Sequence, residues 1–294
     1  MKLFYYLVLT RPANVITAIS DILAGVAIVG ILDSSSQSSL NIILLCLATA
    51  GLYAGGIVFN DIFDLETDKT ERPERVIPSG KLSQKEALVF GFILFLFGIS
   101  FALNVSYLSG FIASCIAAFA LIYDKFAKHH ILAGPLTMGL CRGLNLLLGM
   151  SVLANNILPE FWMMAFIPII FIAAITLTSQ GEVLGNNKLS VSFALFLDFL
   201  VVIIILFLAN KGLMSLWSVL PFVTLWFGIN FIAKFKAIKK NEPKYIMNAV
   251  KMGVLSLIPL NASYVAGFSD WRYGIAVLLL LPISILLARK FSVT

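Results

Sequence analysis

A short acidic run follows the second long apolar segment of the chain, with aspartates at positions 61, 64 and 68. These positions are spaced i, i+3 and i+7, so a helix that continues through the run places all three carboxylates on one stripe. Like charges at such spacings repel one another and destabilise a bare helix. A divalent cation reverses that effect, and Mg²⁺ typically binds one or two carboxylates together with phosphate oxygens of a substrate. The spacing therefore predicts a Mg²⁺ site formed by Asp61, Asp64 and Asp68.

The connection that follows, residues 69–81, contains two prolines and is rich in cations, among them Arg72 and Arg75. Arginine binds phosphate oxygens through two parallel hydrogen bonds. Carboxylates for a metal beside cations for phosphate are what an anionic, phosphate-bearing substrate requires. A second interpretation is that the acids end a solvated interfacial helix and form salt bridges with Arg72 and Arg75.

The elements that must position these residues are membrane-spanning helices. Of the 294 residues, 60% are hydrophobic and only 12% are charged, and the mean hydropathy is +0.98. A soluble domain carries about 25% charged residues. The sequence therefore predicts a single domain, 1–294, that is an all-α polytopic transmembrane bundle around a central cavity opening at the cytoplasmic side. Segments long enough to cross ~30 Å of hydrocarbon lie at 14–32, 40–59, 86–104, 107–123, 132–153, 159–178, 191–209, 213–233, 249–267 and 271–288.

The basic residues divide sharply between the two sets of alternating connections. One set holds only Lys211 and Arg272, and Arg142 lies within a span. The other set holds Lys2, Arg11, Lys69, Arg72, Arg75, Lys81, Lys85, Lys125, Lys128, Lys188, Lys234, Lys236, Lys239, Lys240, Lys244, Lys251, Arg289 and Lys290. Cytoplasmic connections carry the excess of Lys and Arg. We therefore expect a multi-pass protein of the inner (plasma) membrane with both termini and the acidic run cytoplasmic, and the net charge of +6 does not require a nucleic-acid partner.

The pattern Asn60-Asp61-x-x-Asp64-x-x-x-Asp68, followed by Arg75-Val76-Ile77-Pro78-Ser79-Gly80, closely resembles the first aspartate-rich motif of the UbiA superfamily of intramembrane prenyltransferases. Arg11-Pro12-x-Asn14 resembles the N-terminal signature of that family. Tyr123 and Lys128 resemble its tyrosine–lysine loop after the fourth span, at a less common spacing. The run 134–145, taken with 179–186, is most similar to the EboC-like branch.

The resemblance implies a Mg²⁺ cofactor and a set of site residues. The expected catalytic residues are Asp61, Asp64, Asp68, Tyr123 and Lys128. The expected metal ligands are Asp61, Asp64, Asp68 and Glu182. The expected substrate-binding residues are Asn14, Asn60, Arg72, Arg75, Arg142, Asn145, Glu182 and Asn186.

A second segment repeats the spacing of the first, with Ser179, Glu182 and Asn186 in place of the three aspartates. Both segments end even-numbered spans, which suggests two pseudo-repeated half-sites, 60–82 and 179–190, facing each other across the cavity. A single carboxylate remains in the second, and neutral oxygens are weaker Mg²⁺ ligands. The alternative is a capped helix end in an ordinary connection.

Among the polar residues within the spans, six need an explanation: Asp21, Arg142, Asn145, Asp198, Asn230 and Asn261. An isolated charge at the centre of a spanning helix costs about 2.5–3.5 kcal/mol, so we expect Arg142 to be paired. The pairing is either a structural salt bridge from Arg142 to Asp198 or Asp21, or part of an acceptor pocket formed by Arg142 and Asn145.

The sequence predicts Mg²⁺-dependent transfer of a prenyl group from an allylic prenyl diphosphate to a small acceptor, an aromatic or polyhydroxylated ring, within the bilayer. Two alternatives remain. One is a non-catalytic homologue that binds prenyl lipids, and the other is a secondary transporter, because spans, pseudo-repeats and intramembrane charges are also features of transporters.

The charge distribution gives a direct test of topology. Ten spans place the C-terminus on the same side as the N-terminus, whereas nine spans place it opposite. A reporter fused after Thr294 should be active on the cytoplasmic side. Activity only on the external side would contradict the ten-span count.

Overall fold

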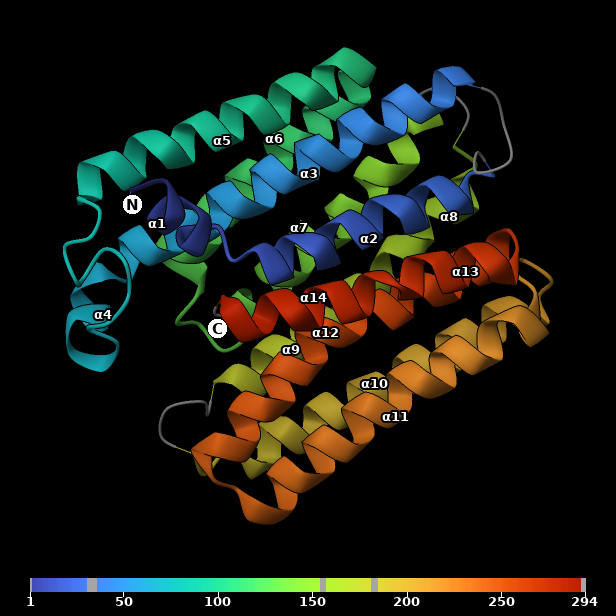
Figure 1. Cartoon of the computed structure of the whole chain (residues 1–294). Helices are drawn as coiled ribbons and strands as arrows, with labels where there is room; N and C mark the ends of the chain where they lie inside the picture. Colours follow the sequence, from blue (N-terminus) through green and yellow to red (C-terminus); the bar gives the residue numbers. More distant parts are fainter. Residues whose placement is uncertain (1, 31–35, 154–156, 181–184, 292–294) are drawn as a thin grey trace.

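The computed structural model describes residues 2–30, 36–153, 157–180 and 185–291, and the regular elements in these ranges are helices (Figure 1). Their order is α1 (Lys2–Leu9), α2 (Pro12–Ile28), α3 (Ser36–Phe63), α4 (Leu65–Glu71), α5 (Gln84–Val105), α6 (Tyr107–Ile122), the π-helix η1 (Tyr123–Ala127), α7 (Ala133–Met150), η2 (Ser151–Leu153), α8 (Pro159–Trp162), η3 (Met163–Ala165), α9 (Phe166–Ser179), α10 (Lys188–Asn210), α11 (Leu216–Lys240), α12 (Pro243–Phe268), α13 (Trp271–Leu278) and α14 (Leu280–Lys290). The all-α transmembrane architecture is confirmed.

Nine helical segments among the described residues are long and apolar enough to cross a membrane, and the bent pair α1 and α2 brings the number to ten if it counts as one span. The first predicted span, 14–32, differs from the helix that forms there. Helix α2 has 17 residues, about 26 Å at 1.5 Å per residue, and α1 meets it at 50°. The bend arises because Arg11 adopts a left-handed conformation (φ 45°) and Pro12 opens α2.

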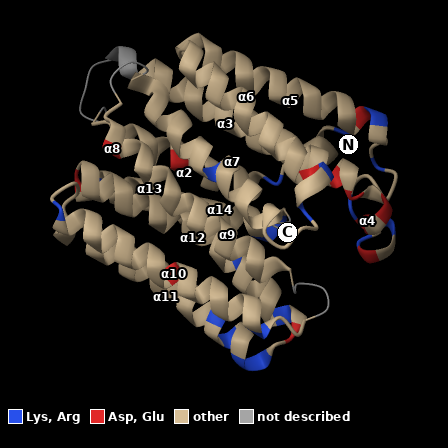
Figure 2. Ribbon diagram, turned by 180° about the vertical axis from the view of Figure 1, so that it is seen from behind, with Lys and Arg blue, Asp and Glu red and all other residues tan. Residues whose placement is uncertain are grey.

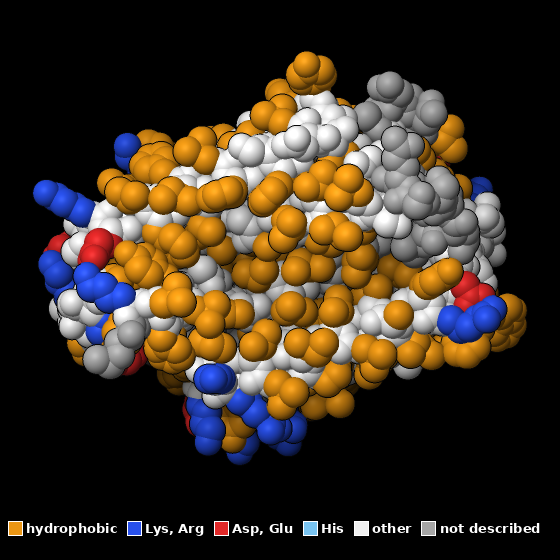
Figure 3. Space-filling model, turned by 45° about the horizontal axis from the view of Figure 1, so that its top comes forward, with side chains coloured by type: hydrophobic (Ala, Val, Ile, Leu, Met, Phe, Trp, Pro, Cys, Tyr) orange, Lys and Arg blue, Asp and Glu red, His pale blue; other side chains and the backbone are white. Residues whose placement is uncertain are grey.

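Helices α2, α7 and α12 form the centre of the bundle. The most apolar window of α12 is 83% buried, whereas the corresponding window of α13 and α14 is 17% buried. The outer helices expose apolar side chains over most of the visible surface, and charged side chains gather at its edges (Figure 3). This distribution matches a bilayer solvent, in which the burial of apolar surface no longer drives helix association.

Close packing of α2 on α7 depends on two glycines. A Cβ atom added at Gly25 would lie 2.4 Å from the Leu146 carbonyl oxygen, and one at Gly149 would lie 2.5 Å from that of Ile22. The two backbones are therefore in direct contact, as small residues allow between membrane helices. This contact holds the polar residues of α7 against those of α2.

Charged residues gather at the two ends of the bundle. One end, termed the basic end here, carries α4, η1 and the α11–α12 turn, where most Lys and Arg residues lie (Figure 2). The opposite end carries Lys211, Asp270 and Arg272. The placement of these basic connections at one end agrees with the charge pattern, and the assignment of the basic end to the cytoplasm stays a prediction.

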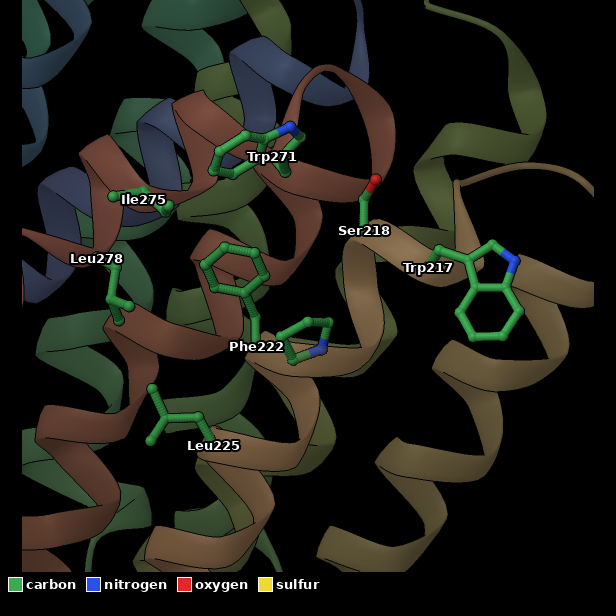
Figure 4. Close-up of a pocket in the computed structure, with 8 residues that line it drawn as sticks. Trp217, Ser218, Phe222, Leu225, Trp271, Ile275 and Leu278 are labelled. Carbon is green, nitrogen blue, oxygen red and sulfur yellow. The ribbon is translucent and has the colours of Figure 1, made fainter.

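A half-open apolar hollow of about 520 Å³ lies between α11 and α13, near the end opposite the basic end. Trp217, Phe222 and Trp271 are among its lining residues (Figure 4). Tryptophan is enriched where hydrocarbon meets water, so the two indoles are placed to anchor this end at the interface. The expected central cavity that opens at the cytoplasmic side stays a prediction.

The glycine contact predicts a stability difference. Gly149→Ala should lower the free energy of unfolding by roughly 1–3 kcal/mol, because the new methyl group overpacks the α2–α7 crossing. Gly228→Ala in α11 is the control, since a Cβ there meets no atom within 4 Å. Thermal unfolding in detergent measures both. Equal melting temperatures for the two variants would contradict the close contact of α2 with α7 at Gly149.

Candidate functional site

The acidic run does not form one uninterrupted helix. Helix α3 ends at Phe63 and α4 begins at Leu65, with Asp64 between them at φ −83° and ψ 0°. Hydrogen bonds from the Asp64 amide to the Asn60 carbonyl (2.9 Å) and from the Asp68 amide to the Asp64 carbonyl (2.8 Å) nevertheless carry the helical pattern across the break. The run is thus divided at Asp64 into α3 and α4, and the common stripe of the three carboxylates stays a prediction.

Asp61 and Asp68 share one guanidinium group. Nη1 of Arg75 lies 2.6 Å from Oδ2 of Asp68 and 3.5 Å from Oδ1 of Asp61. The three side chains are largely buried, with at most 15% of each exposed. One cation thus compensates two carboxylates that would otherwise repel each other in a poorly solvated site. The sequence anticipated this pairing as the structural interpretation of Arg75.

Arg11 provides a second cation for Asp61. Its Nη2 lies 2.7 Å from Oδ1 of Asp61, although 50 residues separate them in sequence. A positive φ in a non-glycine residue is uncommon and costs of order 1–3 kcal/mol. The strained backbone holds the guanidinium at the acidic run. The sequence places Arg11 among the basic flanking residues and in the Arg-Pro-x-Asn signature but not among the expected site residues, and that signature is the signal for its role in the site.

Lys128 forms an ion pair with Asp64. It follows the π-helix η1, and its amide donates a hydrogen bond to the Tyr123 carbonyl at 2.9 Å, five residues back. Single-turn π-helices are frequent at functional sites because they re-aim side chains. The expected tyrosine–lysine loop is thus a π-helical turn. Within it Asp124 is buried and accepts a hydrogen bond from Nδ2 of Asn60 at 2.8 Å. Asp124 is a second residue that the sequence interpretation missed.

The other residues expected around this site occupy nearby positions. Tyr123 begins η1 and is partly buried. Arg72 caps the C-terminus of α4 and is also partly buried. Asn14 is buried in the first turn of α2, where its carbonyl accepts a hydrogen bond from Thr17 Oγ1 at 2.7 Å. Their roles toward a substrate stay predictions.

The donor chemistry of this cluster fits a hard divalent cation. No three His, Cys, Asp or Glu residues within the described ranges converge as a metal-ligand group, because each aspartate faces a cationic side chain instead. Asp61 and Asp68 nevertheless point at one shared positive centre, Nη1 of Arg75. Carboxylate oxygens are the ligands Mg²⁺ prefers, so a metal could bind here once Arg75 has turned away.

The second segment lies at the same end of the bundle, but it is only partly described. Glu182 lies outside the described residues. Oδ1 of Asn186 accepts a hydrogen bond from Nδ2 of Asn241 at 3.0 Å, so this side chain contacts the α11–α12 turn. Oγ of Ser179 donates to the Thr176 carbonyl at 2.8 Å. These contacts agree with the alternative of a capped helix end, and the facing half-sites stay a prediction.

A buried polar network lies deeper in the bundle, centred on Asp21. Nε of Arg142 lies 2.6 Å from Oδ2 of Asp21, and Nδ2 of Asn145 donates to the same oxygen at 2.8 Å. Nδ2 of Asn261 donates to Oδ1 of Asp21 at 2.6 Å. The carboxylate, 1% exposed, thus joins α2, α7 and α12. Asn145 also accepts a hydrogen bond from Thr49 at 2.6 Å.

Of the two salt bridges considered for Arg142, the one to Asp21 forms and the one to Asp198 does not. Asp198 instead pairs with Lys234 at 2.6 Å, with both side chains fully buried. Lys234 lies inside α11, although it was expected in a connecting segment. Asn230, one turn away, donates to Ser256 at 2.7 Å. The acceptor pocket proposed for Arg142 and Asn145 stays a prediction.

The fold and these residues define a class of membrane protein with a carboxylate–cation site at one end of a helical bundle. The model of the UbiA prenyltransferase family matches residues 22–251. The chain belongs to the UbiA prenyltransferase family.

Named relatives and solved structures agree with this membership. The chain is 30% identical over 184 residues to digeranylgeranylglyceryl phosphate synthase of Ignicoccus hospitalis, a match covering 63% of this chain and 59% of that relative. It thus spans about three fifths of the relative's length. A solved structure described as digeranylgeranylglyceryl phosphate synthase in membranes superposes with a TM-score of 0.68 at 24% identity, covering 91% of this chain and 98% of that chain.

A UbiA homologue from Archaeoglobus fulgidus bound to GPP and Mg²⁺ superposes with a TM-score of 0.65 at 14% identity, covering 94% of this chain and 99% of that chain. At these identities the two structural matches show the fold. The narrower resemblance to the EboC-like branch stays a prediction.

The shared cation at Asp61 and Asp68 predicts a metal-sensitive stability. Arg75→Gln should lower the free energy of unfolding by roughly 1–3 kcal/mol, because two buried carboxylates lose their common partner. Added Mg²⁺ should recover more stability in this variant than in the wild type. Thermal unfolding with Mg²⁺ and with chelator measures both effects. Arg72→Gln is the control, since the Arg72 guanidinium makes no ion pair with described residues, and identical behaviour of the two variants would contradict the assignment.

Proposed function

We propose that this protein is a Mg²⁺-dependent prenyltransferase that moves a prenyl group from an allylic prenyl diphosphate to a small acceptor within the membrane. The observation that carries the proposal is the alternation of carboxylates and cations at the basic end of the bundle. Asp61, Asp64 and Asp68 are interleaved there with Arg75 and with the cations of two distant segments, Arg11 and Lys128. Membership of the UbiA family supports it.

The aspartates would hold the metal, and Glu182 would be a supporting ligand. When bound, Mg²⁺ supplies Lewis-acid stabilisation of the negative charge that develops on the leaving diphosphate. The chain's own cations would bind the same group. A guanidinium binds phosphate oxygens in a planar, bidentate manner, which suits Arg11 and Arg75, whereas Lys128 acts as a point charge. Four further side chains are proposed to contact the diphosphate: Tyr123, Asn14, Asn60 and Arg72.

The ion pairs have a further role before the substrate binds. Each of the three aspartates of the acidic run has a cationic partner, so these carboxylates are compensated in a poorly solvated site. When the anionic head group enters, the cations exchange carboxylate for phosphate and the carboxylates become free to bind metal. The donor C–O bond then breaks and its electron pair leaves with the diphosphate. A hydroxyl oxygen of the acceptor bonds to C1 and its proton passes to water. Aromatic side chains among the spans would stabilise the allylic cation.

For the acceptor we propose a glyceryl phosphate in place of the expected aromatic or polyhydroxylated ring. The support is the name of the matched relatives, digeranylgeranylglyceryl phosphate synthase. Such an acceptor presents an aliphatic hydroxyl and a phosphate. Arg142 and Asn145 are proposed to help bind it, because both carry hydrogen-bond donors within the membrane-spanning part of α7.

Two alternatives predict different behaviour. A prenyl-lipid-binding scaffold would bind the donor without releasing diphosphate. A secondary transporter would place its site near the bilayer midplane, whereas the interleaved charges here lie at the end of the helices. We place the basic end in the cytoplasm of a cell whose inner membrane contains the protein, since Lys and Arg gather there.

The decisive experiment incubates purified protein with geranyl, farnesyl and geranylgeranyl diphosphates, a glyceryl phosphate acceptor and Mg²⁺. Diphosphate release and mass spectrometry of the lipid products measure the reaction. Wild type should release diphosphate only with Mg²⁺ and acceptor. Binding of the donor without release would favour the scaffold.

Variants should rank by the contribution that each side chain is proposed to make to metal binding. Asp61→Ala and Asp64→Asn should reduce kcat/KM by roughly 10²–10³, the cost of losing a group that stabilises developing charge. Asn186→Ala should change it only a few-fold, because that side chain contacts Asn241, and Glu182→Gln should fall between them. Equal, mild losses in all four variants would contradict the proposed site.

A further inference from the structure

A second charged surface lies at the basic end, apart from the aspartates. It consists of the four exposed lysines at the α11–α12 turn, Lys236, Lys239, Lys240 and Lys244, and is termed the lysine corner. Among the described residues none of the four forms a salt bridge, and Glu242 is the one acid between them. Figure 2 shows these lysines as a blue group at the α11–α12 turn, separate from the charges around α4. The surface therefore carries uncompensated positive charge.

The turn that presents these lysines is held in place by a neighbouring segment. Asn241 ends α11 in a left-handed conformation (φ 53°), and its carbonyl accepts a hydrogen bond from the Asn186 amide at 3.3 Å. The Asn241 side chain donates back to that of Asn186 at 3.0 Å. These two contacts fix the ends of α11 and α12 relative to the start of α10. The lysine corner is therefore a defined surface with fixed spacing.

The helix dipoles explain only part of the cluster. Lys239 and Lys240 lie in the last turn of α11, where the negative end of the helix favours cations. Lys244 lies in the first turn of α12, immediately after Pro243, where the positive end of the helix disfavours a cation. An anion from outside the chain would offset this unfavourable interaction. The described part of the chain supplies no such ion pair for Lys244.

Apolar side chains mark the level of the bilayer directly beside the lysines. Phe235, which precedes Lys236, is 52% exposed, and Ile232, one turn earlier, is 57% exposed. Met247 on α12 is exposed in the same way, one turn from Lys244. Lysine stems lie along apolar surface while their ammonium groups reach the head-group layer. A bilayer that covers these apolar side chains would therefore bring its phosphate groups close to the lysine corner.

From this geometry we propose that the lysine corner binds anionic phospholipid head groups of the adjacent leaflet. Clusters of four to eight Lys or Arg residues next to a spanning helix attract anionic lipids. The lysine corner has the charge of such a cluster and lies directly beside lipid-facing apolar side chains. Positive-inside topology requires an excess of cations on one side of the membrane, but it does not require four unpaired lysines at one turn. The inference is independent of prenyl transfer.

The test compares a variant that removes the four charges with a variant that keeps them. All four lysines are changed to glutamine in one and to arginine in the other. Purified protein is supplied with equal amounts of phosphatidylglycerol and phosphatidylcholine, and native mass spectrometry gives the ratio of the two bound lipids. Wild type should prefer phosphatidylglycerol, the glutamine variant should lose at least about fivefold of that preference, and the arginine variant should retain it. Added salt should weaken the wild-type preference.

Each other outcome overturns the proposal. An unchanged lipid ratio in the glutamine variant, or no preference in the wild type, excludes an anionic-lipid site at the lysine corner. Equal loss in both variants assigns the effect to packing. Displacement of phosphatidylglycerol by soluble polyglutamate assigns the surface to acidic peptides. If the fourfold glutamine variant does not purify, the pairs Lys236→Gln with Lys239→Gln, and Lys240→Gln with Lys244→Gln, should each lower the ratio, and no change in either pair contradicts the proposal.

Discussion

Compensation of buried carboxylates by cations from distant segments governs this structure. Asp61 and Asp68 share Arg75, Asp61 also contacts Arg11, and Asp64 contacts Lys128. Removal of one partner would leave a charge in a poorly solvated site, a change that typically costs several kcal/mol in a protein interior. The bend at Arg11, the break at Asp64 and the π-helix before Lys128 all serve these contacts. Local deviations from ideal helix geometry therefore gather where the charges meet.

A second set of compensated charges holds the middle of the bundle together. Asp21 forms a salt bridge with Arg142 of α7 and accepts hydrogen bonds from Asn145 of α7 and Asn261 of α12. These two helices pack closely around α2. The Gly25 and Gly149 crossing brings Arg142 and Asn145 near enough to reach it. In hydrocarbon an unpaired polar group has no water to bind, so such networks must be complete within the protein. The same rule explains why Asp198 and Lys234 form a fully buried pair.

Several features were predictable because they repeat along the chain. Apolar runs of about 20 residues gave nine of the ten spans, and the spacing of the aspartates gave the position of the charged site. The failures have local causes. The first span is short and bent because Arg11 takes a left-handed conformation before Pro12. Lys234 directly follows the predicted span 213–233, whereas α11 continues to Lys240. The ion pair with Asp198 allows Lys234 to be buried inside this helix.

The sequence by itself determined the class of fold, the family and the acidic run, because hydropathy, charge asymmetry and motif spacing are local properties. The partners of the charged residues were decided only by tertiary structure. Arg11 and Lys128 reach the aspartates from positions 50 and 64 residues away in the chain, and no periodic pattern encodes such pairs. Asn186 occupies the position that corresponds to Asp68 in the repeated spacing, yet its side chain accepts a hydrogen bond from Asn241 at the α11–α12 turn. These pairings are determined by helix packing, which depends on contacts across the whole bundle.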